Sequence, residues 1–159
     1  MTNDAGKLSK DEAVSIQVIS SSLNSRMRII YESDIATYGG KPDYIIMLRQ
    51  LALMVSVTRA FRLRYNRTEK KHTDTFDAAE ATRLLRKKLF GLARCMDYSG
   101  YFMKDAGAVP GTAIKPILHI LCPSRHNMEI CWEVYNNLLE PAANIQVIFS
   151  LVEDEGVFI

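Results

Sequence analysis

The chain has 159 residues, which is about the length of one domain. Hydrophobic residues make up 48% of it and charged residues 24%, a balance that is typical of a globular protein and excludes disordered, collagen-like and coiled-coil chains. Uncharged apolar-rich stretches such as residues 50–58 are well short of the ~20 residues that a membrane-spanning helix needs. We therefore expect a flexible N-terminus, residues 1–12, followed by one domain, residues 13–159.

The N-terminus and the cysteines both indicate the compartment. Residues 1–12 are polar and lack the apolar segment of a signal peptide. Cys95, Cys122 and Cys131 are odd in number and have no CxxC spacing, which favours free thiols in a reducing compartment. We expect a cytoplasmic protein that is not secreted and has no transmembrane segment.

The first 65 residues predict two strands and a long helix. Apolar residues alternate with other residues in 14–18 and again in 27–31, which predicts two strands that pair as an antiparallel hairpin. Residues 39–43 contain two glycines and a proline and predict a break. In residues 44–65 apolar side chains recur at spacings of three and four, which predicts a central, buried helix.

The remainder of the chain predicts two more helices between strands and loops. Residues 66–75 are polar and predict an exposed loop, after which Thr75 or Asp77 caps a helix that ends near residues 98–100. The inner stripe of that helix is expected to be Ala81, Leu85, Leu89, Leu92 and Met96. Residues 106–112 predict a loop, and residues 114–120 predict a strand in which Pro116 lies at an edge or near the start. A short helix is predicted over residues 128–139. Two strands joined by a turn are predicted at residues 145–151 and 157–159.

These elements together predict an α+β fold in a single domain. A small, mostly antiparallel sheet is expected to pack against two longer helices and one short C-terminal helix. Trp132 shares a helical face with Met128 and Tyr135, so we expect it in the core.

Charge is distributed unevenly along the sequence. The net charge is +2, yet residues 59–94 contain eleven basic and four acidic residues, a net +7, which leaves −5 for the remainder. Such a segment attracts phosphate backbones or anionic lipid headgroups, although the alternative is a solvated face without a partner. Phe61 and Tyr65 lie among these arginines; Phe61 is as well suited to the core, whereas Tyr65 is the better candidate for exposure. The candidate nucleic-acid or membrane-binding residues are Arg59, Arg62, Arg64, Tyr65, Arg67, Lys70, Lys71, Arg83, Arg86, Lys87 and Lys88.

Motifs of known catalytic chemistry are absent from the sequence. It has no Gly-rich phosphate loop, no GxSxG and no HExxH, so we expect a protein that is not an enzyme and has no catalytic residues or cofactor. The grouping closest to a metal site is Cys122, His126 and Cys131, for which His119 is the available fourth ligand. Cys131 also belongs to an apolar stripe, and we favour core packing over a metal.

The C-terminal part resembles the matrix proteins of rhabdoviruses. The resemblance rests on a strand at residues 114–120, a short helix with a tryptophan at 128–135, an apolar strand at 145–152 and a charged turn with a last strand at 153–159. The predicted early hairpin followed by residues 31–36 is similar in style to the family's N-terminal strand where it enters the first helix. The Lys-rich N-terminus and proline-rich budding motif of animal-infecting members are missing, so the resemblance is to the smaller proteins of plant-infecting members.

The resemblance implies a non-enzymatic structural protein of the virion and the host cytoplasm. Such a protein self-associates and bridges ribonucleoprotein and anionic membrane, here through the basic segment. Its acidic ends would meet the basic middle of another copy head to tail, which builds an open polymer that dissolves as salt rises. The alternative is a cytosolic RNA-binding or adaptor domain. Neither hypothesis calls for a small-molecule substrate.

Overall fold

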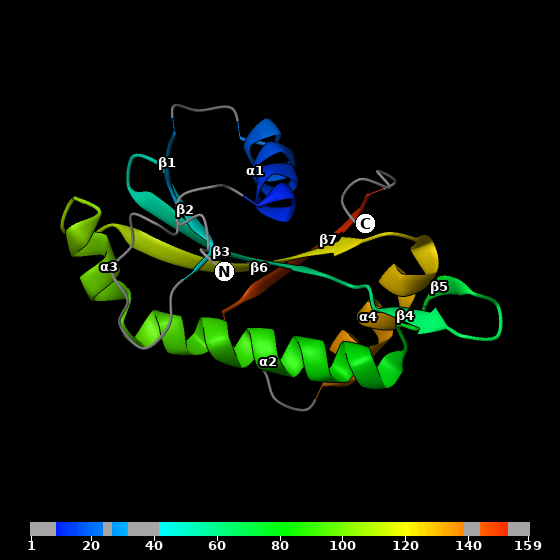
Figure 1. Ribbon diagram of the computed structural model, residues 1–159. Coiled ribbons are helices and arrows are strands. Elements are labelled where there is room, and N and C mark those ends of the chain that lie inside the picture. Colours follow the sequence, from blue (N-terminus) through cyan, green and yellow to red (C-terminus); the bar gives the residue numbers. More distant parts are fainter. Residues whose placement is uncertain (1–8, 24–26, 32–41, 139–143, 153–159) are drawn as a thin grey trace, which may run out of the picture.

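The computed structural model describes residues 9–23, 27–31, 42–138 and 144–152. Helix α1 lies on one face of a five-stranded sheet, and α2 and α4 lie on the other face (Figure 1). The predicted α+β class is confirmed. In chain order the elements are α1 (Lys10–Ser21), β1 (Arg28–Tyr31), β2 (Tyr44–Met47), β3 (Leu51–Arg59), β4 (Leu63–Asn66), β5 (Lys71–Asp74), α2 (Ala78–Asp97), α3 (Ser99–Asp105), β6 (Ala113–Cys122), α4 (Arg125–Asn137) and β7 (Gln146–Leu151).

The large sheet is mixed, whereas the sequence predicted a mostly antiparallel one. Its strand order is β1-β2-β3-β6-β7, and the pairs β1/β2 and β2/β3 are antiparallel whereas β3/β6 and β6/β7 are parallel. Strands β4 and β5 form a separate antiparallel hairpin (Figure 1). The hairpin therefore projects from the end of β3 without joining the sheet.

Two apolar cores fill the spaces on either side of the sheet. On the α1 side, Ile19 of the helix packs with Ile46, Val55 and other strand residues. On the opposite side, the α2 stripe packs against strand residues such as Met54 and Leu118. Because both faces are covered, strands β2, β3 and β6 read as nearly continuous apolar runs rather than alternating ones.

Pro116 occupies the part of β6 that β7 does not reach. The β6/β7 pairing begins at Ile117, one residue later, while β3 pairs along all of β6. The Ala113 N–H donates to the Gln50 carbonyl on the β3 side, so even-numbered residues of β6 direct their backbone groups toward β7. Pro116, which has no N–H, therefore faces the open side, near the start of the strand as predicted.

The N-terminal strand prediction is wrong, since residues 10–21 form helix α1. Ser9 and Glu12 make a reciprocal capping box, with Glu12 N–H bonded to Ser9 Oγ and Ser9 N–H to the Glu12 carboxylate. The inward side chains of the helix are Ser15 and Ile19, four residues apart. A buried serine at an inward position hid the helical period. The expected hairpin is also wrong, because β1 pairs with β2. Residues 1–8 of the predicted flexible terminus lie outside the described residues, whereas Lys10 already begins the helix.

The predicted helix over residues 44–65 is wrong as well. This segment forms β2, β3 and β4, and residues 71–74 of the predicted loop form β5. Fully buried strands show the same density of apolar residues as a buried helix, so the spacing alone does not separate them. The β-branched residues Ile45, Ile46, Val55, Val57 and Thr58 favour the strands.

From Asp77 onward the sequence prediction agrees closely with the structure. Asp77 caps α2, whose buried residues include Ala81, Leu85, Leu89 and Leu92. Helix α3 was not predicted, but strands β6 and β7 and helix α4 lie where expected. The predicted last strand, residues 157–159, lies outside the described residues.

Candidate functional site

The β4/β5 hairpin carries an exposed basic tip. Asn66 shapes its turn, because the Asn66 Oδ1 accepts hydrogen bonds from the Thr68 and Glu69 N–H groups at 2.9 and 3.3 Å. Arg67 and Lys70 on this turn are exposed, as is Arg64 on β4. Tyr65, with 54% of its surface exposed, contacts His72 across the strands at a ring distance of 5.1 Å.

Hydrogen bonds that the Asp74 carboxylate accepts and the Asn127 amide donates fix the base of the hairpin. The Asp74 Oδ1 accepts from the Arg62 and Phe76 N–H groups. Its Oδ2 accepts from the side-chain amide of Asn127 on α4, which also donates to the Ala60 carbonyl. Asn127 is buried, and its own N–H is bonded to Ser124, the cap of α4. The hairpin is thereby attached to α4 as well as to the sheet.

The outer face of α2 is the second basic region. Its apolar stripe faces the sheet, which leaves Arg83, Arg86, Lys87 and Arg94 exposed on the other sides of the helix. Phe90 lies among them with 67% of its surface exposed, and the Arg94 guanidinium is 6.0 Å from the centre of its ring. This helix therefore presents cations around an exposed aromatic side chain.

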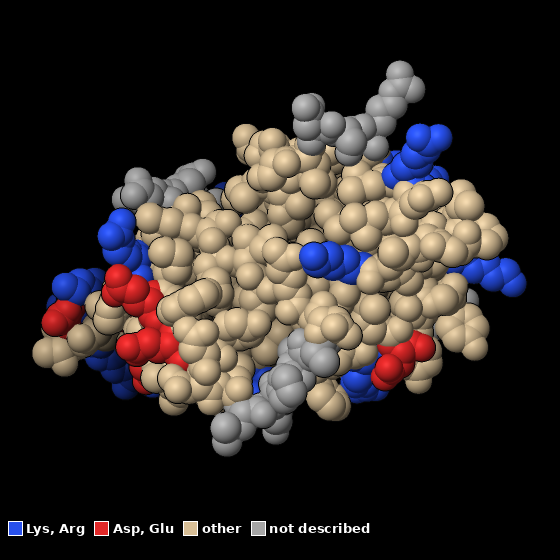
Figure 2. Space-filling model, turned by 180° about the vertical axis from the view of Figure 1, so that it is seen from behind, with Lys and Arg blue, Asp and Glu red and all other residues tan. Residues whose placement is uncertain are grey.

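Glu80 joins the two basic regions. Its carboxylate pairs with Arg62 at the start of the hairpin and with Arg83 one turn along α2. The two cationic stretches therefore meet at the N-terminal end of α2 rather than lying on opposite faces of the molecule. Seen from behind, basic and acidic side chains gather toward the end of the molecule that holds the hairpin in Figure 1 (left in Figure 2).

Besides Arg62 and Arg83, which pair with Glu80, three more of the predicted binding residues make polar contacts within the protein. Arg59 pairs with Asp11 of α1 at 3.2 Å. Lys88 is half-buried and its Nζ donates to the Val57 carbonyl at the end of β3 at 3.1 Å, so it is not part of the exposed set. Lys71 pairs with Glu69 at 2.8 Å but remains exposed. Phe61, for which the sequence left core and surface open, is half-buried.

The candidate binding residues left out four residues of this region. Phe90 and Arg94 extend the α2 face; the sequence already places Arg94 in the basic segment on the outer side of this helix, and the helical spacing with Arg83 and Lys87 identifies Phe90. Arg125 and His126, both exposed, begin α4 beside Asn127, whose contact with Asp74 brings them close to the hairpin. No signal in the sequence links these two residues to the hairpin, because the link is a tertiary hydrogen bond.

A separate polar network is buried on the α1 side of the sheet. His119 Nδ1 is 2.6 Å from Ser15 Oγ, which is 2.8 Å from the Tyr44 hydroxyl. His119 Nε2 is 2.7 Å from Ser150 Oγ. Burial lowers the pKa of His119 to about 4 and raises the pKa of Tyr44 to about 12. The ring is therefore neutral near pH 7, and the network connects α1, β2, β6 and β7.

The possible metal ligands do not converge. Cys122 of β6 and Cys131 of α4 are both buried in the core between the sheet and that helix. A hydrogen bond between the two thiols, together with burial, raises the pKa of Cys122. His126 is exposed, and the His119 side chain is bonded to Ser15 on the opposite side of the sheet. Among the described residues no three His, Cys, Asp or Glu side chains form a metal-binding cluster.

Trp132 lies at the surface, so the prediction that it belongs to the core is wrong. It is 54% exposed and contacts Phe149 of β7 edge to face, at a ring distance of 5.7 Å. The buried residues of α4 are Asn127 and Cys131, the neighbour of Trp132. The predicted stripe placed Trp132 and Cys131 on the same buried side, whereas the buried side of α4 is narrow.

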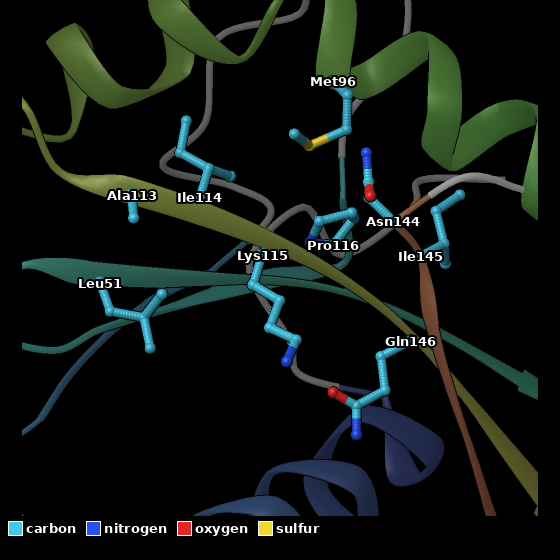
Figure 3. Close-up of a pocket in the computed structure, with 9 residues that line it drawn as sticks. All are labelled: Leu51, Met96, Ala113, Ile114, Lys115, Pro116, Asn144, Ile145 and Gln146. Atoms are coloured by element: carbon cyan, nitrogen blue, oxygen red, sulfur yellow. The ribbon is translucent and has the colours of Figure 1, made fainter.

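An open groove of about 670 Å³ lies where β6 extends beyond β7 (Figure 3). Lys115 and Gln146 point from its strands toward α1, while Met96 and Asn144 lie on the α2 side. Among the described residues of the lining, Lys115 is the one that carries a charge, and the others are mostly aliphatic. These described residues include no pair of groups suited to acid–base or nucleophilic chemistry.

Within the described residues, no helix combines the length and the apolar character that crossing a membrane requires. Comparison of the chain with models of known protein families finds no match, and neither does comparison with curated protein sequences.

Proposed function

We propose that this protein is a non-enzymatic structural protein of the matrix type, which binds anionic membrane and ribonucleoprotein through its basic surface and self-associates. The basic surface consists of the exposed cations of the hairpin and of α2: Arg64, Arg67, Lys70, Lys71, Arg83, Arg86, Lys87 and Arg94. The observation that carries the proposal is that these two regions meet at Glu80.

The charge balance of this surface supports binding of a polyanion. In the described part of the chain, no acidic side chain pairs with Arg64, Arg67, Lys70, Arg86 or Lys87. Each cation near an anionic membrane contributes about 1 kcal/mol, so several together give substantial binding that salt weakens. Most of the positive charge of this surface is therefore available to a partner.

Phe90 favours a membrane as one of the partners. An exposed aromatic side chain amid arginines and lysines is the combination that interfacial helices insert between lipid headgroups. Phe90 is 67% exposed at the middle of α2, with Arg94 beside its ring. The apolar contact of Phe90 would add to the electrostatic attraction of the surrounding cations.

The second candidate function, a cytosolic RNA-binding or adaptor domain, is favoured by Tyr65 and His72. These exposed rings lie on one face of the hairpin, 5.1 Å apart, among cations. Aromatic rings beside a cationic surface provide stacking platforms for single-stranded bases. The two functions therefore use the same cations but different aromatic residues.

Co-sedimentation and RNA binding test the proposal together. The probes are phosphatidylcholine vesicles with and without phosphatidylserine, and single-stranded RNA, each across a salt series. We expect binding to phosphatidylserine vesicles and to RNA at low salt. Arg86→Glu with Lys87→Glu removes two cations at about 1 kcal/mol each, so vesicle binding should fall by at least about thirtyfold.

The matched control changes the same net charge elsewhere. Arg49→Glu with Lys104→Glu reverses two exposed basic residues that lie outside the basic surface. An equal loss of binding in this control would contradict a localised surface. Phe90→Ala should weaken vesicle binding and leave RNA binding unchanged, whereas Tyr65→Ala should do the reverse. Binding to RNA alone would leave the second candidate function in place of the first.

A further inference from the structure

Among the described strands, β7 (Gln146–Leu151) lies at an edge of the sheet, and its own sequence lacks the usual protective residues. Among the described strands it pairs only with β6. Its sequence, QVIFSL, contains no charged residue, no proline and no glycine. Natural edge strands are normally protected by charges, prolines or bulges, because an open edge pairs with other chains. The composition of β7 is that of a strand with a neighbour on both sides.

The backbone groups on the open side of β7 can be identified from its pairing. The Val152 N–H donates to the Cys122 carbonyl at 2.9 Å, and Cys122 lies opposite Leu151 in the register. In a parallel ladder alternate residues bond to the same neighbour, so the even-numbered residues of β7 face β6. The N–H and C=O groups of Val147, Phe149 and Leu151 therefore point outward.

We propose that β7 of two copies of this chain pair antiparallel about Phe149, joining two five-stranded sheets into one of ten strands. In this register Phe149 lies opposite Phe149, and Val147 lies opposite Leu151 of the second copy. All three outward residues of each strand then find partners within the other strand. A two-fold axis perpendicular to the sheet relates the copies, so the assembly closes as a dimer.

The side chains next to this edge suit an interface. Val147 and Phe149 pack on the side of the sheet that α4 covers, where Phe149 contacts Trp132 and Tyr135 at ring distances of 5.7 and 6.2 Å. Trp132 and Leu151 remain 54% and 41% exposed. The two-fold axis would bring two such aromatic clusters together, and buried aromatic residues at the centre of a patch contribute most to protein–protein binding.

The opposite side of the strand is compatible with the same pairing. The Ser150 hydroxyl is hydrogen-bonded to His119 within its own chain, so it does not compete with the backbone groups that would bond to the second copy. This dimer rests on one part of the proposed function, the self-association of the protein, and β7 is the surface that would be responsible for it. Because that surface is apolar and distinct from the basic surface, the dimer should persist in salt that dissolves contacts between opposite charges.

Sedimentation velocity of the full chain in high salt tests the dimer. The wild type should sediment with twice the mass of one chain, and Leu151→Lys, which places a charge at the edge, should sediment as a single chain. Val109→Lys, at an exposed loop residue, should remain dimeric. A single-chain mass for the wild type, or a dimer of unchanged affinity for Leu151→Lys, would overturn the inference. Leu151→Lys should keep the vesicle binding that Arg86→Glu with Lys87→Glu loses, and the latter should keep the dimer.

Cysteine cross-linking tests the register and does not depend on the folding of a lysine variant. Opposite residues of a hydrogen-bonded antiparallel pair lie about 5.5 Å apart at Cα, within the range of a disulfide. Chains with Val147→Cys mixed with chains with Leu151→Cys should form a covalent dimer on mild oxidation. Ile148→Cys, whose side chain lies on the other side of the sheet, should not cross-link to Leu151→Cys. Equal cross-linking in both mixtures would contradict this register.

Discussion

The side-chain amide of Asn127 on α4 lies 2.7 Å from the carboxylate of Asp74 at the end of β5. The same nitrogen lies 2.7 Å from the Ala60 carbonyl, between the sheet and the hairpin. One buried amide therefore holds together the end of β3, the base of the hairpin and the start of α4. The orientation of the basic tip relative to α2 depends on this contact.

Replacing Asn127 should loosen the hairpin. Asn127→Ala leaves the Ala60 carbonyl and one Asp74 oxygen without their donor, which should lower the free energy of unfolding by about 1–3 kcal/mol. Urea unfolding measures the loss, and hydrogen exchange should locate increased opening in β4 and β5. Asn137→Ala, which removes an exposed side-chain bond to the Glu133 carbonyl, serves as the control and should change stability by less. Unchanged exchange in the hairpin would show that the amide does not fix it.

Stability should fall in mild acid because of His119. Its pKa is about 4 in the folded protein and near 6.5 when the ring is solvated, so the unfolded chain binds more protons between these values. The stabilisation is fully present above pH 6.5 and is lost as the pH falls toward 4. The difference corresponds to roughly 3 kcal/mol at most.

The measurement is the melting temperature of wild type and His119→Gln from pH 7 to pH 4. The gap between the two proteins should narrow with acidity, since only the wild type carries the ionisation of this ring. His126→Gln, at an exposed histidine, should follow the wild type across the range. A gap that stays constant with pH would mean that His119 titrates equally in the folded and unfolded states.

Lys87 and Lys88 should separate binding from stability. Lys88→Met removes the hydrogen bond to the Val57 carbonyl and should cost about 1–2 kcal/mol of stability with little effect on vesicle binding. Lys87→Met removes an exposed cation and should weaken vesicle binding with little effect on stability. Chemical unfolding and co-sedimentation of both variants decide the matter; the reverse pattern would place Lys88 on the binding surface.

Trp132→Ala should cost far less than a core truncation. Leu85 is fully buried on the side of α2 that faces the sheet, and Leu85→Ala should lower the free energy of unfolding by about 2–5 kcal/mol. Trp132 keeps 54% of its surface exposed, so its truncation should cost about 1 kcal/mol, mainly through the contact with Phe149. Thermal unfolding in dilute solution compares the two. Equal costs would indicate that Trp132 is covered by another copy even in dilute solution.

The sequence was most informative where one face of an element is polar. Helix α2 has water on its outer side, so the apolar stripe from Ala81 to Leu92 shows the helical period, and Asp77 marks the start. Strands β2 and β3 are covered on both faces and lose any such period. In α1 the inward Ser15 broke the stripe, although the Ser9 and Glu12 capping box was present in the sequence.

The candidate site was predictable in its charges but not in its contacts. Clustering along the chain identified exposed cations such as Arg67 and Lys87, because charged side chains rarely leave water. It could not show that Lys88 turns inward to Val57, since this depends on where the end of β3 lies. The prediction for Trp132 was wrong for a related reason, because the elements that pack against α4 set the width of its buried side.

The parallel pairing of β3 with β6 bears on how fast this chain reaches its native state. Every paired residue in the register, from Leu51 with Ala113 to Arg59 with Leu121, is 62 positions apart, since 113 − 51 and 121 − 59 both equal 62. The centre of the sheet therefore closes a long loop that contains the hairpin, α2 and α3. The entropy of closing that loop is lost before the pairing compensates for it, which makes the step slow. The open edge of β7 becomes available only after β6 has joined the sheet, so association through that edge would follow folding of the monomer.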